Sequence, residues 1–138
     1  MRGNKVMIER KKLIYLASPY SDPCPAVRED RFLHICSVAA KLMRAGYFVL
    51  SPIAHCHAID AWDVTSGGWG YWAEYDKRLM QSCDEVWVCC MQGWRDSIGV
   101  RAEIQIAGEL CLPVRYISGH GEPLTHAPKN KNSLRITT

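Results

Sequence analysis

Four short apolar runs alternate with segments of helical periodicity, and this alternation constrains the fold more than any other feature. The runs lie at residues 12–18, 47–51, 85–90 and 113–118. A strand that is apolar along its whole length is buried on both faces, so the pattern predicts a parallel sheet covered by helices on both sides. Sheets of this kind bind ligands at the carboxyl ends of their strands.

Apolar residues at three- and four-residue steps predict helices over residues 26–45, about 71–83 and from Ser97 to about 110. Residues 53–70 mix His, Asp and Trp with a pair of glycines, which favours a long surface loop. Long loops in compact domains are often functional.

The helix predicted after Ser97 carries an acid where its neighbours are apolar. Glu103 lies inside a stripe formed by Val100, Ile104, Ala107 and Leu110. A carboxylate that faces a core costs on the order of several kcal/mol unless it is paired or used. Gly99 lies one turn earlier on the same face and predicts open space where Glu103 points. Ser97 is the expected N-cap, and the free N–H groups of the first turn favour an anion at this end of the helix.

Each of these residues also has a structural explanation. Glu103 could form an ion pair with Arg28 or Lys77, and Ser97 could act only as a cap. Tyr15, on the first predicted strand, belongs to a residue type that is more often a core aromatic than a catalytic group.

A second acid, Asp76, interrupts the apolar stripe of the helix predicted over residues 71–83. Together with Glu103 it gives two carboxylates on neighbouring helices, both facing inward beside the ligand-binding edge of one sheet. Paired carboxylates of this kind cleave glycosidic bonds, and the acid of the pair needs a raised pKa, which partial burial of Asp76 would supply.

The histidines of the predicted loop point to substrate contact more than to a metal. His55 and His57 share a side of an extended segment, but no third or fourth ligand follows at a recognised spacing, so we assign no metal ligand. The aromatic residues nearby either cover a base by stacking or pack as a lid on their own domain; they are Trp62, Trp69 and Trp72.

The composition is that of a soluble single domain of 138 residues, with 48% hydrophobic and 22% charged residues. A net charge of +3 with scattered basic residues argues against a nucleic-acid polymer as partner, and no run of about 20 apolar residues predicts a membrane span. Seven cysteines without a Cys-x-x-Cys pair favour a reducing cytoplasm. Motifs for dinucleotides and nucleoside triphosphates are missing, and we expect no cofactor.

Several motifs in order resemble the nucleoside 2-deoxyribosyltransferase superfamily, and in particular its small bacterial and phage branch with a Gly-Trp-x-x-Ser-x-Gly-x-x-x-Glu signature. The likeness covers about residues 13–118. The motifs are Leu13–Tyr20 (LIYLASPY), Ser51–His55 (SPIAH), Tyr75-Asp76 and Gly93–Glu103 (GWRDSIGVRAE).

The resemblance implies a role for each catalytic candidate. Glu103 would be the nucleophile that attacks the anomeric carbon, Tyr15 would hold that carboxylate, and Asp76 would be the acid near the departing base. Ser97 and Gly99 are similar to the Ser-x-Gly-x-x-x-Glu version of deoxynucleoside monophosphate N-glycosidases, in which the serine contacts the 5′-phosphate. The other candidate substrate contacts are Arg28, which would add charge there, and Ser18, Tyr20, His57 and Asp96.

These observations predict a flavodoxin-like or Rossmann-like three-layer α/β sandwich with a parallel sheet of four to five strands. The domain spans residues 13–118, after a basic leader at 1–12 and before a polar, loosely ordered tail at 119–138. The predicted activity is hydrolysis of the base–sugar bond of a (deoxy)nucleoside 5′-monophosphate through a glycosyl-Glu103 intermediate. The alternatives are a base-exchanging 2-deoxyribosyltransferase and a non-catalytic nucleotide sensor or sponge. The resemblance also implies a homodimer or higher oligomer.

Overall fold

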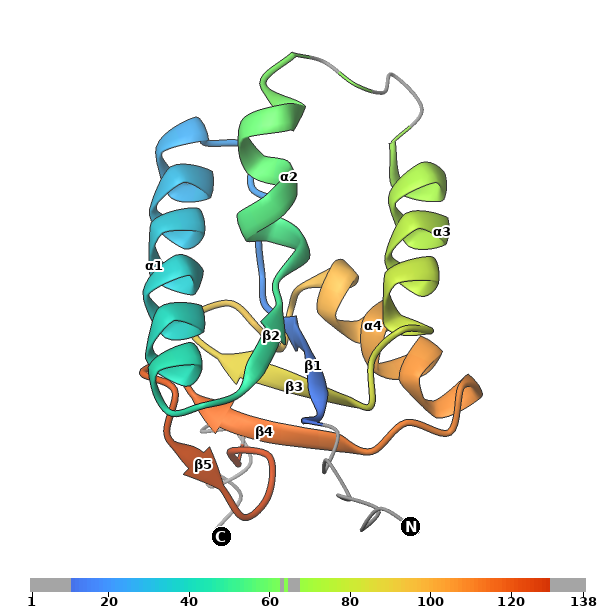
Figure 1. The fold of residues 1–138 in the computed structure, drawn as a ribbon. Helices are drawn as coiled ribbons and strands as arrows, with labels where there is room; N and C mark the ends of the chain where they lie inside the picture. Colours follow the sequence, from blue (N-terminus) through green and yellow to red (C-terminus); the bar gives the residue numbers. More distant parts are fainter. Residues whose placement is uncertain (1–10, 63, 65–67, 130–138) are drawn as a thin grey trace, which may run out of the picture.

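The chain folds into three layers, with one sheet between helices (Figure 1). The computed structural model describes residues 11–62, 64 and 68–129. The five strands are ordered β2-β1-β3-β4-β5, and all pairs are parallel except β4 with β5. The α/β class predicted from the sequence is therefore confirmed. The strands are β1 (Leu13–Ala17), β2 (Phe48–Leu50), β3 (Glu85–Cys90), β4 (Val114–Ser118) and β5 (Pro123–Leu124).

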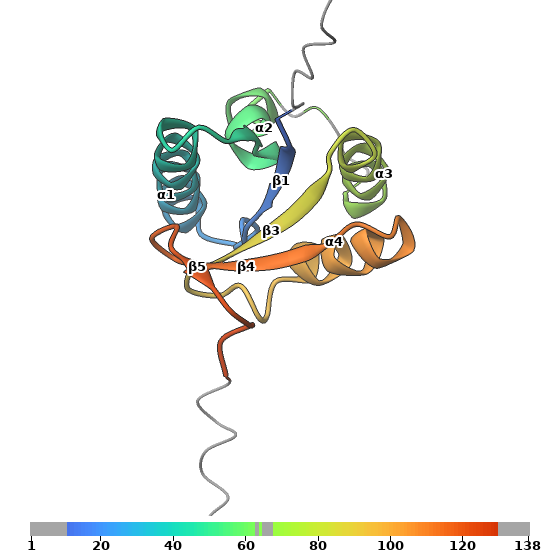
Figure 2. The same ribbon diagram turned by 60° about the horizontal axis from the view of Figure 1, so that its bottom comes forward.

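Helices cover both faces of the sheet (Figure 2). Along β1, Ile14 and Leu16 pack in the core under α1, whereas Tyr15 and Ala17 pack in the core on the side of α3 and α4. This alternation is the two-residue period of a strand, and it places Tyr15 on the face that carries Glu103. The helices are α1 (Pro25–Arg44), α2 (Pro52–Asp60), α3 (Trp69–Met80) and α4 (Ile98–Glu109).

Helix α2 corrects the sequence prediction, because residues 53–60 are helical and not part of a long loop. Ser51 caps the helix by accepting a hydrogen bond from the N–H of Ala54, and Pro52 occupies the first turn, where it needs no hydrogen bond. This local start signal outweighs the mixed composition that suggested a loop. Residues 63 and 65–67 of that segment lie outside the described residues.

The end of the described chain also differs from the prediction. The segment after Gly119 was expected to be loosely ordered, but Pro123 and Leu124 form β5 on the edge of the sheet, opposite Ile117 and Tyr116. The outer parts of the predicted leader and tail, residues 1–10 and 130–138, lie outside the described residues. None of the described helices combines the length and apolar character needed to cross a bilayer.

The strand order reverses direction between β1 and β3, which lie side by side. At such a switch point the loops after the two strands diverge and leave a crevice at the carboxyl edge of the sheet. Ser18–Cys24 follows β1 and Met91–Ser97 follows β3 at this edge. The fold therefore brings together the segments that carry most of the predicted site residues.

Candidate active site

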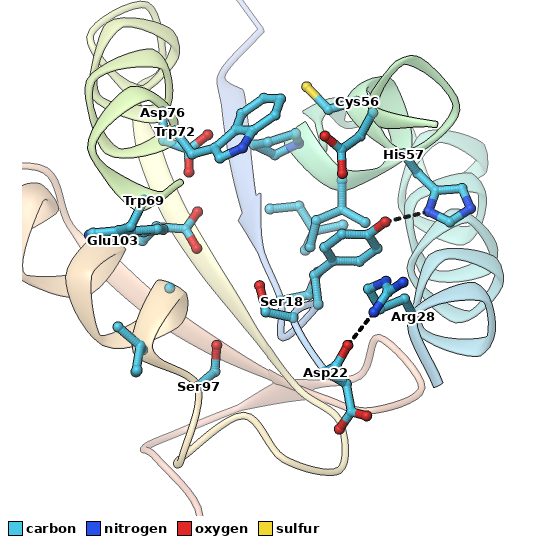
Figure 3. A pocket seen from close by; sticks show the side chains of 18 of the residues that line it. Ser18, Asp22, Arg28, Cys56, His57, Trp69, Trp72, Asp76, Ser97 and Glu103 are labelled. Atoms are coloured by element: carbon cyan, nitrogen blue, oxygen red, sulfur yellow. Dashed lines mark hydrogen bonds between the residues drawn. The ribbon is translucent and has the colours of Figure 1, made fainter. Parts of the chain in front are cut away.

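A cavity of about 600 Å³ opens at this edge of the sheet. Figure 3 shows Trp69, Trp72 and Asp76 of α3, Glu103 of α4 and the cap residue Ser97 on one side, and Asp22, Arg28, Cys56 and His57 on the other. Every site residue predicted from the sequence lines this cavity except Tyr15, which lies wholly buried. Those lining residues are Ser18, Tyr20, Arg28, His57, Asp76, Asp96, Ser97, Gly99 and Glu103.

Glu103 is a buried acid that faces the cavity and lacks a basic partner. Its exposed fraction is 6%. Among the residues that the structure describes, no lysine or arginine forms an ion pair with it. Arg28 instead donates to the backbone carbonyl of Asp22, and Lys77 is exposed. The purely structural explanation, an ion pair with Arg28 or Lys77, is therefore wrong.

Burial raises the pKa of both carboxyl groups. It raises the pKa of Asp76 to about 6, and that of Glu103 to about 8, where the negative charge of Asp76 contributes as well. Asp76 was expected to have the raised pKa and Glu103 to carry the charge, but burial acts more strongly on Glu103. With one pKa on each side of neutrality, the pair holds one proton at pH 7, and the two groups titrate as one system.

Two buried hydroxyl groups at the site lack a well-formed hydrogen bond within the described part of the chain, those of Tyr15 and Ser18. The Tyr15 hydroxyl is close enough to Glu103 and Asp76 that its interaction lowers the pKa of each carboxyl group somewhat. Burial and the charges of these two acids raise the pKa of Tyr15 itself, so its proton stays on the oxygen. An unsatisfied buried hydroxyl costs about 1–3 kcal/mol, so these groups stand where a ligand or a reaction can use them.

The start of α4 has the predicted cap. Ser97 Oγ accepts a hydrogen bond from the N–H of Val100 at 3.2 Å. The hydroxyl proton of Ser97 remains free for a ligand, as do the earlier N–H groups of the turn, which have no acceptor inside the helix.

The space beside Gly99 is not empty as predicted. A Cβ at this position would lie 3.7 Å from the ring of Trp69, which is an ordinary contact. The indole of Trp69 therefore forms part of the cavity wall next to Glu103, a contact between α3 and α4 that periodicity within α4 could not reveal.

On the opposite wall, His57 connects two side chains. Its Nδ1 lies 2.6 Å from the hydroxyl oxygen of Tyr20, and its Nε2 lies 2.7 Å from a carboxylate oxygen of Glu29. The imidazole stacks on Phe32 with ring centroids 4.1 Å apart. Glu29 was not identified from the sequence, because its contact with His57 joins two helices and leaves no local pattern.

The cavity is rich in acids. Besides Asp76 and Glu103, it is lined by Asp22, Asp60 and Asp96, whereas Arg28 is the one lysine or arginine among the described lining residues. Asp22 and Asp60 were not predicted; Asp22 lies on the loop after β1, and Asp60 lies at the end of α2, a helix that was not predicted from the sequence. Within the described residues no three His, Cys, Asp or Glu side chains are grouped as a metal site.

Comparison with known protein families gives a match over residues 12–118 to the family described as "Domain of unknown function (DUF1937)". The chain belongs to the DUF1937 family. The matched region contains every residue of the site, from Tyr15 on β1 to Glu103 on α4.

Among solved structures, this DUF1937 chain is similar to a 2-deoxyribosyltransferase from the psychrotolerant bacterium Bacillus psychrosaccharolyticus. The two chains share 21% identity and align with a TM-score of 0.54 over 91% of this chain and 92% of the other. Comparison with curated proteins gives no match. The structural likeness confirms the resemblance to the nucleoside 2-deoxyribosyltransferase superfamily at the level of the fold.

Proposed function

We propose that this DUF1937 protein cleaves the base–sugar bond of a (deoxy)nucleoside 5′-monophosphate and transfers the sugar to water. One observation carries the proposal: the buried carboxyl group of Glu103 and the half-buried carboxyl group of Asp76 face one cavity without a basic partner in the described chain. Buried acids of this kind destabilise a fold, and their common use is acid, base and nucleophilic chemistry on glycosidic bonds.

In the first step a carboxylate oxygen of Glu103 attacks C1′ of the sugar, and the bond from C1′ to the base nitrogen breaks. The electron pair of that bond goes to the base, which takes a proton from Asp76. Positive charge develops on the sugar as the bond breaks, and the Glu103 carboxylate stabilises this charge before it forms the ester.

This step needs the single proton of the pair on Asp76 and the charge on Glu103. Because the two groups titrate as one system, the resting protein also holds the form in which the proton is on Glu103. One proton transfer from Glu103 to Asp76 converts the resting pair into the reactive one, and the Tyr15 hydroxyl, which interacts with both groups, stabilises the charged Glu103 that results.

In the second step water attacks C1′ of the glycosyl ester. Asp76, now a carboxylate, takes a proton from that water, and the C1′–O bond to Glu103 breaks. The sugar 5-phosphate leaves, and the pair recovers its single proton.

The first turn of α4 supports the proposal that the substrate carries a phosphate. A monoester phosphate accepts hydrogen bonds from N–H groups and hydroxyls, and Ser97 with the first turn of α4 offers both within the cavity. Arg28, on the facing wall, supplies the positive charge.

A second candidate is base exchange between unphosphorylated nucleosides, and the charge of the cavity favours it. Three further acids, Asp22, Asp60 and Asp96, line the cavity against one arginine, which disfavours a dianionic ligand. In this reaction a second base, in place of water, attacks the glycosyl ester. The similar fold of the Bacillus psychrosaccharolyticus 2-deoxyribosyltransferase also supports it.

The test is to incubate the protein with nucleosides and their 5′-monophosphates, with and without an acceptor base, and to quantify free and exchanged bases. Release from a monophosphate in water is expected, and Glu103→Gln should lower it by at least about a thousandfold. Exchange that requires an acceptor and ignores the phosphate would support the transferase. Tight binding without any product would indicate a nucleotide-binding protein and contradict catalysis.

A further inference from the structure

Three side chains form a hydrogen-bonded chain on the wall that faces the two acids. Glu29 of α1 contacts His57 of α2 at 2.7 Å, and His57 contacts Tyr20 of the β1 loop at 2.6 Å. Phe32 stacks against the imidazole with an interplanar angle of 15° and so holds the ring in plane. Tyr20 and His57 line the cavity, whereas Glu29 stands behind them.

The direction of these hydrogen bonds follows from the groups involved. A carboxylate only accepts, so His57 carries its proton on Nε2 and donates it to Glu29. A neutral imidazole then has a lone pair on Nδ1, which accepts from the hydroxyl of Tyr20. Tyr20 thereby uses its only proton, and its oxygen is left with lone pairs alone. With His57 neutral, Tyr20 is therefore a hydrogen-bond acceptor at the cavity.

A second polar group on the same loop, the hydroxyl of Ser18, also faces the cavity. Ser18 lies two residues before Tyr20, lines the cavity, and is 4% exposed, yet its hydroxyl has no hydrogen-bond partner in the described chain. A buried hydroxyl of this kind is satisfied when a bound molecule presents a polar group to it.

The position of the sugar determines which of its hydroxyl groups lies against the wall formed by Tyr20 and His57. With C1′ at Glu103, the base toward Asp76 and the phosphate toward Ser97, all three anchors lie on α3 and α4 or at the start of α4. The remaining hydroxyls of the sugar then face the loop after β1 and helix α2, where Tyr20 and His57 lie.

We propose that Tyr20, fixed as an acceptor by His57 and Glu29, receives a hydrogen bond from a ribose hydroxyl and makes the protein select sugars that carry it. Tyr20 is then a specificity-determining residue, and His57 and Glu29 are positioning residues. This inference rests on the proposed cleavage of a nucleoside or nucleotide.

The experiment compares kcat/KM for a 2′-deoxynucleotide with kcat/KM for its 2′,3′-dideoxy counterpart. The wild-type protein should prefer the compound with the hydroxyl by on the order of tenfold, and Tyr20→Phe should reduce this preference to about twofold or less. A ribonucleotide and a 3′-deoxyribonucleotide, measured alongside, identify which hydroxyl is read. Tyr47→Phe is the matched control, because Tyr47 is exposed and packs on Trp87, outside the cavity lining.

Variants of His57 test the positioning role. His57→Gln keeps an acceptor for Tyr20 and a donor for Glu29, so it should retain the preference for the hydroxyl, whereas His57→Leu should lose it even where base release persists. Unchanged preference in Tyr20→Phe and His57→Leu would overturn the inference and leave the proposed function intact.

The same pair of compounds is also titrated calorimetrically against Glu103→Gln, which keeps the binding wall and removes the nucleophile. A preference that appears in binding supports the role of Tyr20 independently of turnover. Equal affinity for the two compounds in this variant and in its double variant with Tyr20→Phe would overturn it. Base release from no compound, together with binding of none, would overturn the proposed function itself.

Discussion

At the scale of single residues, the site contains polar groups whose burial lowers the stability of the folded state. Glu103 is buried beside another acid, and the hydroxyl of Tyr15 is buried next to both without a well-formed hydrogen bond in the described chain. Neither arrangement stabilises the folded state. The Tyr15 hydroxyl gains a strong acceptor when Glu103 carries the charge that the proposed reaction needs.

The substitution Tyr15→Phe separates the effect of the Tyr15 hydroxyl on stability from its effect on catalysis. The ring stays in the core and only the unsatisfied hydroxyl is lost, so the free energy of unfolding should stay the same or rise by up to about 1 kcal/mol. The hydroxyl can no longer stabilise the charge on Glu103, so kcat should fall by about 10- to 100-fold. Urea denaturation and initial rates measure the two quantities, and a variant that is less stable but fully active would contradict the assignment.

At the scale of elements, α2 and α4 begin with the same kind of N-cap, but only one of the two caps lies at the cavity. Ser51 at α2 and Ser97 at α4 each accept a hydrogen bond from the third N–H that follows, at 3.2 Å in both cases. Only Ser97 lines the cavity. Both caps stabilise their helices, and the first turn of α4 also lines the cavity.

Ser97→Ala and Ser51→Ala therefore form a matched pair. Each should lower the free energy of unfolding by about 1 kcal/mol through loss of a cap. Ser97→Ala should in addition raise KM for a nucleoside 5′-monophosphate by about tenfold while leaving KM for the nucleoside nearly unchanged, because only the phosphate uses that hydroxyl. Equal effects of the two substitutions on monophosphate KM would contradict a phosphate site at α4.

At the scale of the whole molecule, burial of Glu103 ties stability to pH. Its pKa is about 8 in the folded protein against an ordinary value of 4.5, so between these values the folded state binds the proton more tightly than the unfolded chain does. Stability then decreases as pH rises from about 4.5 to 8. This sign is opposite to that of a carboxylate held in an ion pair.

Glu103→Gln removes the titrating group and keeps its shape. Its free energy of unfolding should exceed that of the wild-type protein at pH 8 by about 2–5 kcal/mol, and the difference should shrink toward pH 4, where the wild-type acid is protonated in both states. Chemical denaturation at several pH values measures this difference. A constant difference across the range would show that Glu103 does not titrate within the fold.

Much of the fold could be predicted because it is encoded locally. The period of apolar residues placed β3 at residues 85–90, and the serine cap placed the start of α4 at Ser97. The same period placed Glu103 in a buried stripe, since the inward face of a helix follows from spacing alone. The sequence by itself therefore determined the alternation of β1 to β4 with α1, α3 and α4, though not α2 or β5, and it identified the acid at the centre of the site.

What only the tertiary structure decided depends on groups that are distant in sequence. The ring of Trp69 over Gly99, the contact of Glu29 with His57, and the order of the two carboxyl pKa values all arise where separate elements meet. A pKa follows from how completely water is removed from a group, and a hydrogen-bond direction follows from which partner stands behind it. Neither quantity exists until the helices pack, so no spacing within one segment contains it.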